Sequence, residues 1–350
     1  MKLLFISSSE NDYLQDLTYS GLIEFLGADA VVDYPFHWQY HKPKKNIWSQ
    51  SLPYPHNLGF YSQMNSSWKK QIRKALSSSN GIDSFNGVIL GSAKPDAFRS
   101  IIELFKLIRL PWVFIDGGDR KEIGGDFLRT GGEFCYRQFQ DFIKNYPPAF
   151  IFKRELSIGF QNQTQNLINC PILPLPFSIQ SQKVLILSPN PKPNIQVQFW
   201  AVESSETRRK VFSLLKGHYD CDLNGTFAGQ KFKRYRFKGQ KYFEGLNQCN
   251  ISLSFRGEGF DTLRYWEIPA SGSLLISEQP DIDIPNNFEN GKHSIFCKND
   301  LSDLMEQIDY YLTHPQERLQ IAVAGQKHLL QHHTHLKRAE FILEKIKTAL

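Results

Sequence analysis

Residues 242–278 read YFEGLNQCNISLSFRGEGFDTLRYWEIPASGSLLISE, and this stretch predicts the fold. An apolar strand at residues 250–255 is followed by a glycine-rich turn, a helix that ends at Gly272, and a second apolar strand at residues 273–277. Strand, glycine-rich turn, helix and strand form a βαβ unit, which places ligands at the carboxyl ends of its strands. We therefore expect a binding site at the turn.

The residues of this turn favour an anionic ligand. Arg256 and Arg264 supply positive charge, and Gly257 and Gly259 let a phosphate approach the backbone. Glu267, one helical turn after Arg264, can accept hydrogen bonds from the hydroxyl groups of a sugar or ribose. The alternative interpretation is a helix-capping turn that carries surface charges.

The segment GFDTLRYWEIPASG at residues 259–272 resembles the donor-binding motif of GT-B glycosyltransferases of the group 1 type, in particular their CgeB-like branch. The resemblance continues at FENG (residues 288–291) and DYYLTHP (residues 309–315). It extends over about residues 180–350 and is looser in the first half of the chain.

The resemblance implies an α/β protein with the GT-B fold, in which two Rossmann-like domains face each other across a cleft. We expect an acceptor-side domain at residues 1–178, a nucleotide-sugar donor domain at residues 183–335, and a helix at residues 336–350 that packs back on the first domain. Strands and helices alternate in both halves, as this architecture requires. The expected strands lie at residues 3–7, 30–34, 87–90, 112–115, 150–152 and 184–188, and the expected helices at residues 13–26, 67–76, 97–108 and 207–216 and from residue 302 onward.

The resemblance also implies transfer of a sugar from a nucleoside diphosphate sugar, UDP- or GDP-linked, without a metal or another cofactor. Arg256 and Arg264 are the expected catalytic cations, because they can offset charge on the diphosphate leaving group. The expected donor-binding residues are Arg208, Gly257, Glu258, Gly259, Asp261, Thr262 and Glu267.

One departure from the family pattern concerns the glutamates. Many group 1 enzymes space two glutamates eight positions apart, whereas the residue eight positions after Glu258 is Trp266. The ribose contact is therefore expected at Glu267, and the sugar contact is not transferred to Glu258.

In the first half, the expected strand at residues 112–115 leads into the turn DGGD. Asp116 or Asp119 can take the proton of an acceptor if the reaction inverts the sugar, although a turn also uses Asp and Gly for its backbone geometry. A retaining reaction needs no such base. The aromatic stretch at residues 35–61, with His37 and His41 as alternative bases, is either an acceptor surface or a packed loop.

Composition limits the partners. Lysine and arginine exceed aspartate and glutamate by 41 − 35 = +6, which suits an anionic ligand. Five scattered cysteines without a C-x-x-C pair, together with the absence of a signal peptide, favour a cytoplasmic protein with reduced thiols. No apolar run is long enough to span a membrane, which leaves only peripheral membrane contact.

Three further patterns resemble metal-binding or nucleic-acid-binding motifs, but we interpret them as structural or surface features. The two D-x-D matches at residues 220–222 and 281–283 are read as turns, and the histidines at residues 332–335 as a helix connection. The basic and aromatic segment at residues 231–238 favours a solvated or donor-side surface over nucleic-acid binding.

Two other function classes stay open. A GT-B scaffold can isomerise a nucleotide sugar without an acceptor, as an epimerase does. The altered glutamate spacing is also compatible with an inactive binding protein. The donor sugar, the acceptor and the oligomeric state are not decided by the sequence.

Overall fold

The computed structural model describes residues 1–37, 40, 85–107, 109–159, 170–181, 192–229 and 240–349. Internal contacts divide the chain into two compact units, of which unit 1 contains Met1–Pro176 and His335–Leu350 and unit 2 contains Phe177–Thr334. The expected helix at residues 67–76, the expected strand at residues 184–188 and the basic segment at residues 231–238 lie outside the described residues, as does most of the aromatic stretch.

Unit 1 is built on a six-stranded sheet with the order β2-β1-β3-β4-β5-β6. Its strands are β1 (Leu3–Ile6), β2 (Val31–Tyr34), β3 (Gly87–Leu90), β4 (Trp112–Asp116), β5 (Phe150–Lys153) and β6 (Ile172–Pro174). All neighbouring pairs are parallel, so every strand ends at the same edge. The chain moves outward from β1 in both directions, which puts the topological switch point at the carboxyl ends of β1 and β3.

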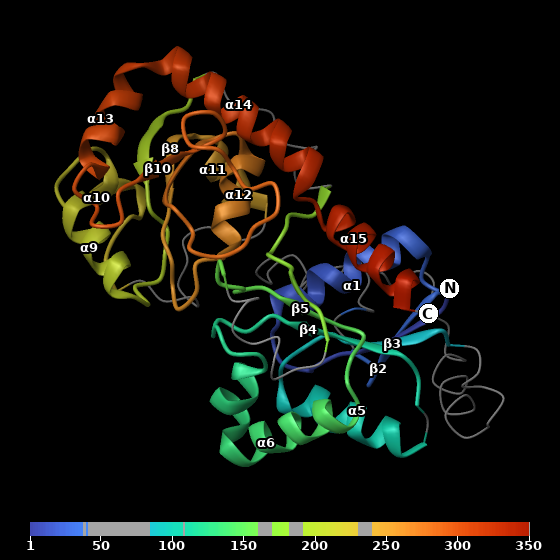
Figure 1. The fold of residues 1–350 in the computed structure, drawn as a ribbon. Helices are drawn as coiled ribbons and strands as arrows, with labels where there is room; N and C mark the ends of the chain where they lie inside the picture. Colours follow the sequence, from blue (N-terminus) through green and yellow to red (C-terminus); the bar gives the residue numbers. More distant parts are fainter. Residues whose placement is uncertain are drawn as a thin grey trace. The chain divides into compact units, whose positions relative to one another are not determined.

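Helices cover both faces of this sheet. Helices α1 (Tyr13–Leu26) and α15 (His335–Ala349) lie together on one face, and α5 (Pro95–Leu107) and α6 (Gly125–Asn145) cover the other (Figure 1). Alternate strand residues serve the two faces: Leu4 belongs to the core formed with α5 and α6, whereas the Phe5 ring meets Tyr19 of α1 at 5.3 Å. Such all-apolar strands are typical of a parallel sheet buried on both sides.

Close backbone contact joins α1 to α15. A Cβ atom on Gly21 would lie 2.4 Å from the carbonyl oxygen of His335, so α15 approaches α1 at a distance that only glycine allows. The approach buries Ala339 and Ile342 completely. The last helix of the chain therefore completes the core of unit 1.

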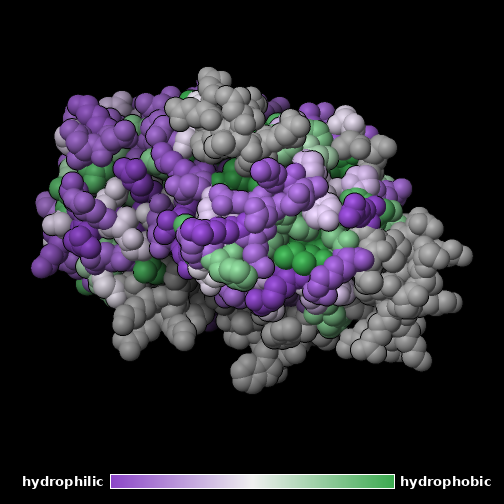
Figure 2. All heavy atoms as spheres, turned by 60° about the horizontal axis from the view of Figure 1, so that its bottom comes forward, coloured by the Kyte–Doolittle hydropathy of each residue, from purple (hydrophilic) through white to green (hydrophobic). Residues whose placement is uncertain are grey.

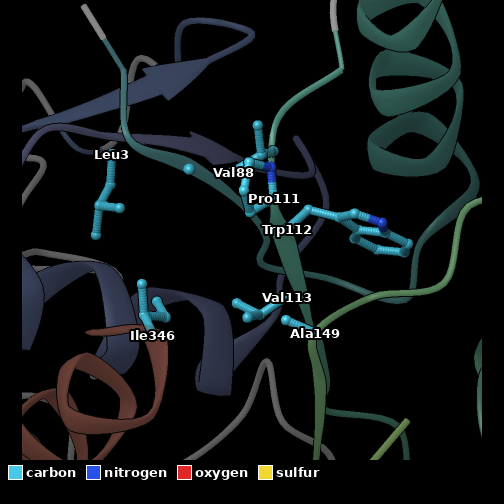
Figure 3. A pocket seen from close by; sticks show the side chains of 8 residues that line it. Leu3, Val88, Pro111, Trp112, Val113, Ala149 and Ile346 are labelled. Atoms are coloured by element: carbon cyan, nitrogen blue, oxygen red, sulfur yellow. The ribbon is translucent and has the colours of Figure 1, made fainter. Parts of the chain in front are cut away.

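A small cavity of about 10 Å³ lies in unit 1 at the amino ends of the strands (Figure 3). It is lined by Leu3, Gly87, Val88, Pro111, Trp112, Val113, Ala149 and Ile346. A space of this size holds about one water molecule, and an apolar lining gives water no hydrogen-bond partner. The cavity is a packing gap at the edge opposite to the one where parallel sheets bind ligands.

Unit 2 is built on a four-stranded parallel sheet with the order β10-β9-β8-β7. The strands are β7 (Ile195–Gln198), β8 (Cys249–Ser254), β9 (Leu274–Glu278) and β10 (Ile295–Cys297). The helices are α9 (Glu206–Leu215), α10 (Cys221–Asn224), α11 (Gln240–Asn247), α12 (Leu263–Ser271), α13 (Leu304–Thr313) and α14 (Pro315–His332). Helices α9 and α13 form a core with one face of the sheet, whereas α11, α12 and α14 contact the other (Figure 1).

Helix α12 ends at Gly272, as the sequence predicts. Thr262 precedes it in an extended conformation, and Gly272 ends it in the left-handed region at φ 79°. Glycine adopts that conformation without steric cost, which explains the sharp stop before β9. The strand, turn, helix and strand expected at residues 250–277 are thereby confirmed.

On the face shown in Figure 2, hydrophilic residues predominate and hydrophobic ones form small separate patches. Scattered apolar residues of this kind are normal on a protein surface. Across the described ranges, no helix combines the length and the apolar character needed to cross a membrane. Those same residues contain no cluster of three or more histidine, cysteine or acidic side chains arranged to hold a metal ion.

Candidate functional site

The carboxyl edge of the unit 2 sheet holds an ion pair between two neighbouring strand ends. Arg256 follows β8 by two residues and Glu278 is the last residue of β9. The Oε1 atom of Glu278 accepts the backbone N–H of Arg256 at 2.7 Å, and Oε2 lies 3.1 Å from the Arg256 Nε. The carboxylate is buried, whereas the Arg256 side chain is 36% exposed. The pair therefore presents its positive member to solvent.

Burial acts against the charge of Glu278. It raises the pKa of this carboxyl, while the Arg256 backbone and guanidinium and the charge of Arg208 act in the opposite direction. A buried carboxylate is costly unless cations and hydrogen bonds compensate it. The edge is thus an electrostatic unit of one buried acid and two arginines.

Arg208 fastens the loop after β7 to the end of β8. From α9, it donates hydrogen bonds to the carbonyl oxygens of Phe255 at 3.0 Å and Val202 at 2.9 Å. It is buried, and its Nη2 lies 3.3 Å from where a Cβ on Gly257 would be. The structure therefore brings Arg208, Arg256 and Gly257 together, and the direct phosphate contact expected for Arg208 stays a prediction.

The glycine-rich turn is tightened by its own backbone. Gly257 donates its N–H to the carbonyl oxygen of Gly259 at 3.1 Å, so this amide does not offer itself to a phosphate in the present conformation. The donor contact expected for the Gly257 amide stays a prediction. Gly259 is buried and Glu258 is exposed, so a ligand can meet the Glu258 side chain without rearrangement of the turn.

Arg264 and Glu267 form a second group around two aromatic residues. Arg264 donates through Nη2 to the carbonyl oxygen of Trp200, which follows β7. Glu267 accepts a hydrogen bond from the Tyr242 hydroxyl of α11 at 3.0 Å, and the Tyr242 and Trp200 rings are 6.2 Å apart. The two residues predicted from one helical turn are thus tied to different neighbours of α12.

Asp261 and Thr262 have structural partners. The Asp261 carboxylate is buried and accepts hydrogen bonds from the backbone N–H of Phe177 and from Nε1 of Trp266, the latter at 2.7 Å. The Thr262 hydroxyl lies 3.0 Å from that of Ser254. Donor contact by either residue stays a prediction, and the geometry of Asp261 favours a role in holding α12.

In unit 1, Asp116 is the last residue of β4 rather than part of the turn that follows it. It is completely buried, and its Oδ2 lies 3.2 Å from Nζ of Lys153, which is equally buried. The backbone amides of Gly118 and Gly124 donate to its two oxygens at 3.1 and 2.7 Å. With both oxygens occupied and no exposed surface, Asp116 holds the turn in place, and its expected role as a base stays a prediction.

Asp119 is partly exposed and forms an ion pair with Arg154. Arg154 also donates from Nε to the carbonyl oxygen of Gly117 at 2.9 Å, so it holds the DGGD turn against the end of β5. Asp119 keeps the accessibility that a base needs, and this role stays a prediction.

Sequence reasoning missed a further carboxylate at the unit 1 edge, at the switch point itself. Asp12 follows β1 and accepts hydrogen bonds from the Ser92 hydroxyl at 2.6 Å and from the backbone N–H of Gln15 at 3.1 Å. Burial raises the pKa of Asp12 to about 6, against the opposing effect of these two hydrogen bonds. Its side chain also lies against Gly117, where an added Cβ would be 3.0 Å from Oδ1. A carboxyl group that titrates near neutral pH is suited to proton transfer.

The first D-x-D match has a structural use. Asp220 accepts the backbone N–H groups of Gln196 at 3.0 Å and Val197 at 3.1 Å, and so connects the start of α10 to β7. This arrangement favours the turn interpretation of residues 220–222.

Known proteins resemble this chain both in sequence, over part of its length, and in structure. Residues 207–344 match a family model described as glycosyl transferase-like. The chain is similar in structure to HepE of Anabaena in complex with UDP and glucose, with a TM-score of 0.58 and 12% identity over 99% of this chain and 100% of that one. Comparison with curated protein sequences gives no significant match.

Two further solved structures agree. Sucrose-phosphate synthase from Thermosynechococcus elongatus gives a TM-score of 0.56 at 10% identity over 100% of this chain and 99% of that one. A glycosyltransferase from Rickettsia africae gives a TM-score of 0.56 at 10% identity over 99% and 98% of the two chains. These likenesses confirm the expected GT-B fold with two Rossmann-like domains. The family match covers residues 207–344, less than half of the chain, and does not distinguish a branch.

Proposed function

We propose that this protein transfers a sugar from a nucleoside diphosphate sugar to an acceptor, as a member of the CgeB-like branch of the GT-B glycosyltransferases. The proposal depends above all on Arg256, a partly exposed cation held at the carboxyl edge of the unit 2 sheet beside a glycine turn. That edge is where open parallel sheets bind nucleotides, and a guanidinium there can offset the charge of a diphosphate leaving group.

The division of roles follows from the geometry of unit 2. Arg256 would contact the diphosphate, and Glu267 would accept hydrogen bonds from the ribose in place of the Tyr242 hydroxyl. The cation supplied by the chain is the reason to propose a transfer without an obligatory metal. HepE was crystallised with UDP-glucose, which makes UDP the first nucleotide to test.

In unit 1, Asp12 is our preferred proton acceptor for an inverting transfer, ahead of Asp119 and Asp116. It is partly exposed, lies at the switch point, and has a pKa raised to about 6, which makes it a stronger base than an ordinary carboxylate. A retaining transfer would not need it, so the stereochemistry of the product decides whether this role exists.

The first test is a thermal-shift screen of the full chain against UDP, GDP, dTDP, CMP and ADP, with and without magnesium. A nucleotide that binds only the native state raises the melting temperature by mass action. We expect a selective shift with UDP or GDP and its loss in Arg256→Ala, because a hydrogen bond to a charged group contributes about 1.5–3 kcal/mol, or roughly 10- to 100-fold in affinity. Arg209→Ala is the matched control, since Arg209 is exposed and pairs with Glu203.

Incubation with the identified sugar nucleotide then separates the function classes. Slow hydrolysis of the donor that disappears in Glu267→Ala supports a transferase. A changed sugar nucleotide without any acceptor indicates an epimerase, and tight binding without turnover indicates a binding protein. Absence of any nucleotide-induced shift at millimolar concentration contradicts the proposed donor site.

A further inference from the structure

The carboxylate of Glu278 holds one arginine at two points. Residues Ser254 and Ser277 are partners in the parallel register of β8 and β9, so the next residues of both strands come out side by side at the carboxyl edge. One oxygen of Glu278 accepts the hydrogen bond of the Arg256 backbone N–H, and the other forms an ion pair with the Arg256 Nε at 3.1 Å without a hydrogen bond. The backbone and the guanidinium of Arg256 are therefore fixed by the same side chain.

Two further contacts limit the Arg256 side chain. The ring of Phe260 lies 4.5 Å from the guanidinium carbon, and the Thr207 hydroxyl lies 3.4 Å from Nε. All the hydrogen bonds and ion pairs that the described residues make with the guanidinium use its Nε. The edge formed by Nη1 and Nη2 is thus left for an external partner, and the side chain is 36% exposed. Two parallel N–H donors of this kind match two oxygens of a phosphate.

Burial of the charged Glu278 carboxylate costs desolvation free energy, which a neutral residue at this position would avoid. Glu278 is 2% exposed, and burial raises its pKa. A glutamine of the same shape could keep the backbone hydrogen bond, but its amide would offer a donor to the donor Nε of Arg256. The negative charge interacts with the guanidinium of Arg256 and with that of Arg208, and only Arg256 also contacts the carboxylate directly.

We propose that Glu278 is a positioning residue for the donor diphosphate: it fixes Arg256 so that the Nη1 and Nη2 edge faces the phosphates. This inference rests on the proposed function, because it takes the diphosphate of the sugar donor as the ligand of Arg256. The proposal gives Glu278 a role in the donor site, although this residue ends β9 and lies outside the glycine-rich turn.

The test measures the affinity of the full chain for UDP and for uridine by isothermal titration calorimetry, in wild type and in Glu278→Gln. We expect UDP affinity to fall about 3- to 10-fold, on the scale of the cost of ordering one long side chain, and uridine affinity to stay unchanged. A general structural defect would weaken both ligands. Glu289→Gln is the matched control, since that glutamate is exposed and pairs with Lys292.

A double-mutant cycle with Arg256→Ala decides whether Glu278 acts through Arg256. We expect Glu278→Gln to have no further effect on UDP affinity when Arg256 is already alanine. An equal loss in both backgrounds, or an equal loss for uridine, overturns the proposal. A wild type that binds neither UDP nor another nucleotide removes the proposed function together with this inference, whereas UDP binding that Glu278→Gln leaves unchanged removes the inference alone.

Phe260→Leu gives a second route if Glu278→Gln does not fold. It removes the ring beside the guanidinium and leaves the Glu278 contacts in place. We expect a smaller loss of UDP affinity, about 2- to 3-fold on the scale of an exposed cation–π contact, with uridine unaffected. Unchanged UDP affinity in this variant would contradict a requirement for a fixed guanidinium.

Discussion

The two carboxyl edges of this molecule use ion pairs in opposite ways. In unit 2, Glu278 is buried and its partner Arg256 is 36% exposed, so the pair shows a positive charge to solvent. In unit 1, Asp116 and Lys153 are both fully buried, and the pair shows no charge at all. Ion pairs at the carboxyl edges of two parallel sheets thus leave a cation partly exposed in one case and form an internal support in the other. Position at a strand end does not by itself assign a function; the exposure of the charged group does.

The largest effect on stability is expected from Lys153→Met, which tests whether the buried pair in unit 1 is an internal support. The substitution leaves Asp116 buried without its cation, which typically destabilises a protein by about 3–5 kcal/mol. Urea unfolding followed by circular dichroism measures the loss. Lys106→Met is the control, since Lys106 and Glu103 are both 63% exposed and such surface pairs contribute about 0–1 kcal/mol. Similar losses in the two variants would break the comparison.

A smaller effect is expected from Asp12→Asn, and it depends on pH. The pKa of Asp12 is raised from 3.8 to about 6 in the folded state, so between these values the native protein binds more protons than the unfolded one. Its stability therefore falls as pH rises through this range. Asparagine can also cap α1, and because it does not ionise, the decrease in stability with rising pH should be absent from the variant.

Unfolding of wild type and Asp12→Asn is to be compared at pH 4, 5, 6 and 7. We expect the variant to be more stable by about 1–2 kcal/mol at pH 7, after allowing for solvent screening of a partly exposed group, with the difference vanishing toward pH 4. Asp29→Asn, at an exposed position, controls for the loss of a carboxylate. A difference that is constant with pH would contradict the raised pKa.

The smallest effect is expected from Gly257→Ala at the unit 2 edge. The new Cβ would lie 3.1 Å from the Ser204 hydroxyl and 3.3 Å from Nη2 of Arg208, which is tight but next to side chains that can shift. We expect UDP affinity to fall about 2- to 5-fold with little change in melting temperature, since small overpacking displaces neighbours slightly. A large loss of stability would show instead that this turn is as rigid as the Asp116 anchor.

Much of the fold follows from local sequence signals. The helix expected at residues 13–26 and the strand expected at residues 87–90 have these bounds in the structure. Both have strong signals: Asp12 caps the helix and Gly27 ends it, and the strand is a short apolar run. The GT-B fold could be predicted because its motifs are spread over the second half of the chain, and the similarity to solved structures confirms it.

Helix α6 was not predicted, and its glycines explain why. Gly125, Gly131 and Gly132 lower helix propensity, and Gly132 has a non-helical backbone where the helix kinks. Packing overrides this, because Phe139 and other α6 residues complete the unit 1 core. Strands β6, β7 and β10 were also missed: β6 and β10 have only three residues, and β7 reads IQVQ, so it is not a continuous apolar run like β3.

The candidate site was only half visible in the sequence. Arg256 could be found because it adjoins the glycine-rich turn, whereas Glu278 is 22 positions away and reaches it only through the β8 and β9 register. The signal for Glu278 was an acidic residue that ends an apolar strand, which is common enough to be overlooked. Asp12 could be recognised as a helix cap, but its raised pKa depends on burial that only the folded chain creates.

The packing of α15 on α1 has a consequence for biosynthesis. Unit 2 is one continuous segment, whereas unit 1 needs residues from both sides of it in the sequence. On the ribosome, all of unit 2 is therefore made before the segment that covers Gly21 and the neighbouring face of α1. During that interval the apolar face of α1 must wait for a partner that has not yet been translated, and a chain that stops before His335 would leave it permanently uncovered.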